Sequence, residues 1–139
     1  MQDESIVLSL HLYRRLRARG LRGGSSPGDQ AILDRIEPWI RSPNPVNPLG
    51  YRRFKCSLPG TLEFTVHGLT ISQAITLVDM SATGARVHAI EGLALGERIH
   101  LRIPQRIFGD SLLSWHANVV WAKDGHVGMH FLEIEAATR

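Results

Sequence analysis

Apolar and polar residues alternate along most of the chain beyond residue 60. The alternation falls into six runs, at residues 62–66, 71–77, 85–89, 99–103, 113–121 and 127–131. Because successive side chains of a strand point to opposite faces, each run predicts a strand with one buried face. Turn residues separate the runs, and many short strands joined by tight turns are typical of an antiparallel meander or small barrel. No segment of residues 60–131 has the length or period of a crossover helix, which argues against a parallel sheet.

The N-terminal part of the chain has a helical pattern instead. Residues 4–19 predict a helix because Ile6, Leu10 and Tyr13 recur at helical spacing. The end of this segment and the residues just after it are strongly basic, with Arg14, Arg15, Arg17, Arg19 and Arg22. Two interpretations are open: a frayed helix with a solvated basic end, or an arm that contacts phosphates or acidic lipid.

A second helix is predicted to begin after Ser26. Serine at the cap, Pro27 at the first helical position and Asp29 three residues after the cap form a helix-start signature. An apolar face follows, and Pro38 limits the length of the helix. Residues 41–50 then contain three prolines, which predicts a linker or an extended strap.

The charge and the cysteine content of the chain limit the classes of protein to which it can belong. The formal net charge is +3, and neither residues 1–50 nor residues 51–139 carry the broad basic excess of a generic nucleic-acid-binding protein, so we expect no DNA partner. Cys56 is the only cysteine, so an intramolecular disulfide or a cysteine-based zinc site within one chain is ruled out. No segment approaches the roughly 20 apolar residues of a transmembrane helix. We therefore expect a cytoplasmic protein.

Signatures of catalysis and of metal binding are missing from the sequence. It has no phosphate loop and no H-E-x-x-H motif. His126 and His130 have the spacing of helical metal ligands, but on a strand they would lie about 13 Å apart, too far for one zinc ion. We expect a binding protein with no catalytic residue, no cofactor and no metal.

The connection between the second and third predicted strands carries candidate binding groups. Asp79 can accept hydrogen bonds from an N–H edge, and Ser81 can donate or accept them. Gly84 allows positive φ or close approach of another backbone. An ordinary Asx/Ser turn capped by glycine explains the same residues without a ligand.

A basic segment, residues 51–55, precedes the first strand. In a closed sheet it could fold over the turn that carries Asp79, and Arg52 and Arg53 would then face that turn across a rim. Guanidinium groups suit guanine and phosphate together, because they bond the base edge in bidentate fashion and pair with phosphate oxygens. A solvated basic strand is the alternative. Both Arg53 and Asp79 flank strands, so neither is expected in the core.

These features together resemble the PilZ domains over residues 51 to about 134. The resemblance rests on the arginine lead-in followed by Leu58-Pro59, on the Asp-x-Ser-x-x-Gly turn from Asp79 to Gly84, and on the last two strands, 117–121 and 127–131. It implies a six-stranded antiparallel β-barrel in residues 51–139, with a short C-terminal helical tail. We expect residues 1–50 to form a helical N-terminal extension with a proline-rich linker. The family also implies a ligand, the bacterial second messenger cyclic di-GMP.

The sequence departs from the family pattern at one point. Ligand-binding members usually carry Arg-x-x-x-Arg before the first strand. Counting back from Leu58-Pro59 gives Arg53 the second arginine position and Leu49 the first, whereas counting from Arg52 places Cys56 at the second. A complete Arg-x-x-x-Arg does occur at Arg15 and Arg19, on a probable helix, and it would reach the site if the N-terminal segment folds back.

Two classes of function follow from the resemblance. In the first, the protein is a cyclic di-GMP receptor that signals to a bacterial protein partner, as in control of motility or biofilm. Arg52 and Arg53 then contact phosphate and guanine, while Asp79, Ser81 and Gly84 form the guanine-binding turn. In the second, the domain has lost the nucleotide and acts as a protein–protein adaptor in pilus or motility control.

Overall fold

The computed structural model describes residues 3–24, 26–41, 50–89, 93–107 and 109–132. It contains the two predicted helices and the six predicted strands. The helices are α1 (Asp3–Leu21) and α2 (Pro27–Ile40), and the strands are β1 (Phe54–Val66), β2 (Leu69–Met80), β3 (Gly84–His88), β4 (Arg98–Gln105), β5 (Ser111–Lys123) and β6 (His126–Phe131). Most of the predicted linker (42–49) and of the predicted tail (133–139) lie outside the described residues.

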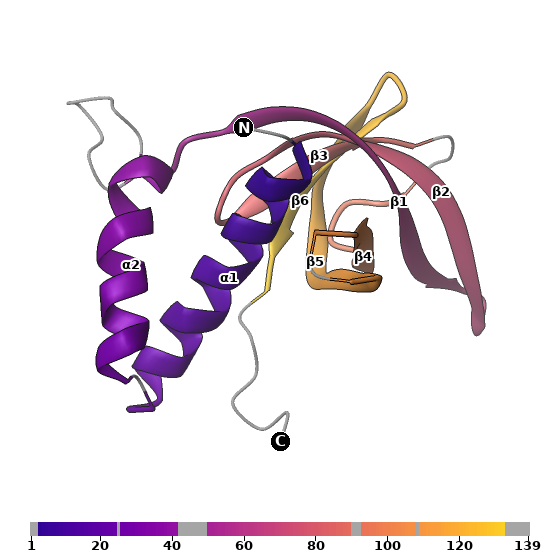
Figure 1. Ribbon diagram of the computed structural model, residues 1–139. Helices are drawn as coiled ribbons and strands as arrows, with labels where there is room; N and C mark the ends of the chain where they lie inside the picture. Colours follow the sequence, from indigo (N-terminus) through magenta and orange to yellow (C-terminus); the bar gives the residue numbers. More distant parts are fainter. Residues whose placement is uncertain (1–2, 25, 42–49, 90–92, 108, 133–139) are drawn as a thin grey trace.

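The six strands form a closed antiparallel barrel in the order β1-β2-β3-β6-β5-β4 (Figure 1). Pairing of β1 with β4, in which Thr61 lies opposite Arg102, closes the barrel. The predicted antiparallel barrel is therefore confirmed. Its interior is filled by the apolar residues of the alternating runs, which include Leu62, Leu77, Val87, Leu101, Ala117 and Val119.

Two tight hairpins set the register of the longest strands. His67 and Gly68 have φ of 51° and 80° between β1 and β2, and Asp124 and Gly125 have φ of 52° and 77° between β5 and β6. Positive φ at both central residues is the turn geometry that matches the natural twist of paired strands. The turn predicted at Asp124-Gly125 is thus present as a two-residue hairpin.

Strand β1 is longer than its alternating pattern predicts, because it begins at Phe54 and continues through Pro59 and Gly60. Both residues are usually strand breakers. A Cβ atom at Gly60 would lie 2.5 Å from Ile103 Cδ1 and 2.7 Å from the Arg102 carbonyl oxygen. The glycine is therefore required where β1 crosses β4 closely.

Helix α1 lies between α2 and the barrel (Figure 1). Its buried face, Ile6, Val7, Leu10, Tyr13 and Leu16, belongs to the same hydrophobic cluster as the barrel interior. Two acids at its start bind the barrel directly: Asp3 accepts the Ser57 backbone N–H at 2.9 Å, and Glu4 accepts that of Arg106 at 2.5 Å. Helix α1 is thus an integral part of the packed structure.

Helix α2 begins with the predicted capping arrangement. The Ser26 hydroxyl accepts the Asp29 N–H, and the Asp29 carboxylate accepts the Ser26 N–H, so each satisfies an N–H group that the helix leaves free. The helix includes Pro38 and ends two residues later at Ile40. Among the described residues, neither α1 nor α2 has an apolar stretch that could span a lipid bilayer.

The position of His11, where α1 packs against the barrel, predicts that the folded protein loses stability at acidic pH. The His11 ring packs edge-on against Trp115, with ring centroids 5.1 Å apart. Burial, helped by the charge of Arg15, lowers the pKa of His11 from 6.5 to about 4. The unfolded chain therefore takes up a proton between these pH values that the folded chain resists, so stability falls as the pH drops from about 6.5 toward 4.

Thermal unfolding at pH 7.5 and at pH 5 measures this effect. We expect the melting temperature of the wild-type chain to fall more on acidification than that of His11→Gln, because glutamine cannot titrate in this range. Equal losses for the two chains would show that His11 does not couple α1 docking to pH.

Candidate ligand-binding site

The arginine lead-in and the Asp79 turn meet at one end of the barrel. Arg53 Nη2 forms an ion pair with Asp79 Oδ1, and Arg86 Nε lies 3.0 Å from Asp79 Oδ2. Asp79 is 7% exposed, so the expectation that it lies outside the core is wrong. Two guanidinium groups compensate its buried negative charge, as a buried carboxylate requires.

Backbone irregularities bring these groups together. The register of β1 with β2 shifts between Lys55 and Leu58, and the register of β2 with β3 shifts between Leu77 and Asp79. Such bulges bend a strand and redirect its side chains. As a result Asp79 belongs to the end of β2 and lies directly opposite Arg86 of β3, whereas the sequence pattern placed it in the turn.

The turn after β2 is held by its own hydrogen bonds. The buried Ser81 hydroxyl accepts the backbone N–H groups of Thr83 and Gly84 at 3.2 and 3.3 Å. A Cβ atom at Gly84 would lie 2.4 Å from the Met129 carbonyl oxygen of β6. Of the two roles predicted for Gly84, the structure shows close backbone approach. Ser81 and Gly84 therefore shape the turn, while Asp79 presents its charged group.

The other predicted arginines lie at different distances from this turn. The Arg52 backbone N–H donates to the Ile40 carbonyl at 2.8 Å, and its guanidinium lies over the Phe54 ring. Arg15 is exposed. Arg19 is bound to Asp29 of α2 at 2.9 Å. The structure brings Arg53 to Asp79, and it places neither Arg15 nor Arg19 in contact with the turn.

A different arginine of α1 reaches the turn. Arg14 donates to the Ala82 carbonyl at 2.9 Å and to the Leu132 carbonyl at 2.6 Å, and it lies over the Phe131 ring. Sequence reasoning missed it because the helical pattern does not show which arginine faces the barrel. Arg14 follows the buried Tyr13 directly and lies four residues after Leu10, which is the signal that could have identified it.

Sequence reasoning also missed Arg86, although the alternating pattern showed which way its side chain points. It is the polar residue between Ala85 and Val87 in the third alternating run, so it had to point away from the barrel interior. Only the register of β2 against β3, which a bulge sets, shows that it faces Asp79.

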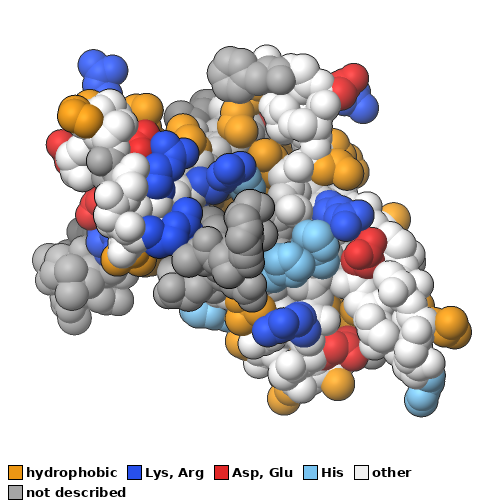
Figure 2. Space-filling view, turned by 90° about the horizontal axis from the view of Figure 1, so that it is seen from below, with side chains coloured by type: hydrophobic (Ala, Val, Ile, Leu, Met, Phe, Trp, Pro, Cys, Tyr) orange, Lys and Arg blue, Asp and Glu red, His pale blue; other side chains and the backbone are white. Residues whose placement is uncertain are grey.

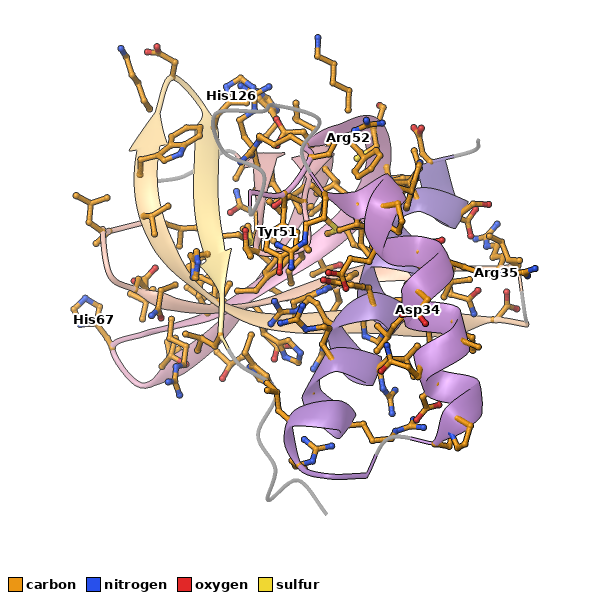
Figure 3. The ribbon with its side chains drawn as sticks, turned by 90° about the vertical axis from the view of Figure 1, so that its left-hand side faces the viewer. Asp34, Arg35, Tyr51, Arg52, His67 and His126 are labelled. Atoms are coloured by element: carbon orange, nitrogen blue, oxygen red, sulfur yellow. The ribbon has the colours of Figure 1, made fainter. Side chains whose placement is uncertain are left out.

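A pocket of about 210 Å³ opens between α1 and the turn. Its walls are α1, the lead-in residue Tyr51, the turn and the end of β6, with lining residues that include Tyr13, Arg14, Arg17, Tyr51, Thr83 and His130. Tyr51 lies between the helices and the barrel, while Asp34 and Arg35 lie on the outer side of α2 (Figure 3). The pocket therefore borders both predicted binding segments.

Cys56 lies close to the acidic groups of the site. Burial and the charges of Asp3 and Asp79 raise the pKa of its thiol to about 12, so it stays protonated at neutral pH. An acidic neighbourhood of this kind suits a cation at position 56, the place where one of the two sequence registers expects an arginine.

The six strands and their charged rim define a small antiparallel β-barrel domain. The chain belongs to the PilZ domain family, since the sequence model of the PilZ domain matches residues 50–139. Curated proteins give no significant match to the sequence.

Among solved structures, 11 chains match. One is the crystal structure of the PilZ domain of CeSA from a cellulose-synthesizing bacterium, with 19% identity, a TM-score of 0.50 and coverage of 60% of this chain and 83% of that one. At this identity the likeness supports the fold alone.

Proposed function

We propose that this protein is a receptor for cyclic di-GMP that passes the signal to a protein partner. The observation that carries the proposal is the ion pair of Arg53 with Asp79, which joins the lead-in and the turn at one rim. Arg53 is 57% exposed on its side chain, so it can exchange Asp79 for a ligand phosphate. The freed carboxylate oxygen can then accept the N–H edge of guanine, while Arg86 keeps its contact with the other oxygen.

Calorimetric titration of the full chain with cyclic di-GMP tests the proposal. We expect saturable binding in the wild type and a loss of about 10- to 150-fold in affinity for Arg53→Ala, the cost of one charge-assisted hydrogen-bonding group. Arg98→Ala removes an exposed arginine of β4 and should leave affinity unchanged. No binding by the wild type at any accessible concentration would refute the receptor.

Restoring the second motif arginine should tighten binding. If residue 56 is the motif position that lacks its arginine, Cys56→Arg puts a guanidinium beside the charge of Asp79. This variant should then raise the affinity for cyclic di-GMP about tenfold or more. If the motif begins at residue 49 instead, Leu49→Arg should be the variant that improves binding. Titration of both variants decides between the registers, and no improvement in either would show that the missing arginine does not limit affinity.

One observation favours an adaptor without nucleotide. Both oxygens of Asp79 already face guanidinium groups, so the charge of the carboxylate is balanced without a ligand. In that case the Arg53–Asp79–Arg86 cluster only stabilises the barrel end, and the domain acts through protein contacts alone. The titration distinguishes the two functions.

A further inference from the structure

The described walls of the pocket beside the turn are basic. Its described lining residues include Arg14, Arg17 and His130, but no Asp or Glu. Figure 2 shows Lys and Arg side chains gathered over the helical side of one face of the molecule. A partly enclosed pocket with two guanidinium groups attracts anions, because screening by water is weaker there than on an open surface.

The two arginines of α1 that line the pocket differ in what they bind. Arg14 holds the backbone carbonyls of Ala82 and Leu132, so its position is fixed by the barrel. Arg17 lies one helical turn further on, where it donates to the Tyr13 hydroxyl at 3.0 Å and lies over the Tyr13 ring. Within the described chain no carboxylate lies within ion-pair distance of Arg17, although the charge of Glu37 helps to raise its pKa. Its guanidinium can therefore still take a direct ion pair with a ligand.

Three aromatic residues belong to the walls of the pocket, and Tyr51 is the one that is partly exposed, since Tyr13 and Phe131 are buried. Tyr13 and Tyr51 pack edge-on, with ring centroids 6.1 Å apart, and Phe131 lies beneath Arg14. Its volume, about 210 Å³, is below the roughly 300 Å³ at which sites for whole drug-sized ligands begin. It suits one part of a larger anionic ligand whose remainder lies on the rim at Arg53.

We infer that α1 completes the binding site, with Arg17 binding a phosphate of the ligand and Arg14 positioning the turn. Helix α1 thereby supplies the cation that the lead-in segment lacks. This inference rests on the proposed cyclic di-GMP receptor. It assigns the completion of the binding site to the face of α1 that carries Arg14 and Arg17. Arg15, which is exposed, and Arg19, which is bound to α2, have no part in the site.

Titration of the full chain with cyclic di-GMP, with thermal unfolding of each variant, tests the inference. We expect Arg17→Ala to weaken binding about 10- to 150-fold, with a melting temperature close to that of the wild type. Arg17→Lys, which keeps the charge, should recover part of the affinity. Arg15→Ala is the matched control on the same helix and should bind as the wild type does.

The possible failures are distinguishable. If the wild type binds and Arg53→Ala weakens binding while Arg17→Ala does not, the receptor stands and the role of α1 is refuted. If Arg15→Ala weakens binding as much as Arg17→Ala, the effect is one of general helix charge and the inference is also refuted. Absence of binding by the wild type overturns both proposals together.

Discussion

Replacing Asp79 by alanine should abolish nucleotide binding and also destabilise the fold. The carboxylate lies between Arg53 and Arg86, so its removal leaves two like charges close together and without their partner. Loss of one partner of a fully buried pair costs about 3–5 kcal/mol. Because the side chains of Arg53 and Arg86 are 57% and 37% exposed, we expect a smaller loss of unfolding free energy, about 1–3 kcal/mol.

Titration with cyclic di-GMP and denaturant unfolding of the same samples measure both effects. Asp110→Ala, which removes an exposed acid outside the site, is the control and should change neither quantity. The double variant Asp79→Ala, Arg53→Ala should be less destabilised than the sum of the single variants, since the second change removes an unpaired charge. An Asp79→Ala chain with wild-type stability would show that the ion pairs contribute nothing to the fold.

The barrel could be predicted from the sequence because its strands are half-buried. A period of two is visible whenever one face of a strand lies against the core, and all six strands were found in this way. The prediction failed at the beginning of β1, where Pro59 and Gly60 resemble a break. There the close crossing with β4 decides the conformation, and it involves Arg102 and Ile103, which lie far away in sequence.

The site was less predictable than the fold. Arg53 and Asp79 could be paired in advance because each belongs to a recognisable short motif. The positions of Arg86 and Arg14 could not be predicted in this way. Arg86 faces Asp79 because of a bulge in the β2–β3 register, and Arg14 reaches the turn because of the rotation of α1 against the barrel. The strand register and the helix rotation both arise from packing between residues far apart in the sequence, which a local sequence pattern does not show.

Replacing Gly84 by alanine should be strongly destabilising, although the change adds only one methyl group. The added Cβ would lie 2.4 Å from the Met129 carbonyl oxygen. That oxygen belongs to the backbone of β6, and the turn is fixed beside it by the bond from the Phe131 N–H to the Thr83 carbonyl at 2.8 Å. Since neither strand can move away freely, we expect a loss of about 1–3 kcal/mol or more in unfolding free energy.

The matched control is Gly28→Ala in the first turn of α2. There the nearest atom to an added Cβ is Ser26 Oγ at 3.6 Å, an ordinary contact, so the unfolding free energy should be unchanged or slightly raised. Nucleotide affinity should fall for Gly84→Ala and stay constant for Gly28→Ala, because only the first displaces the turn that follows Asp79. Equal stability of the two variants would mean that β3 and β6 are further apart than the structure shows, and that the motif glycine has a role other than close strand packing.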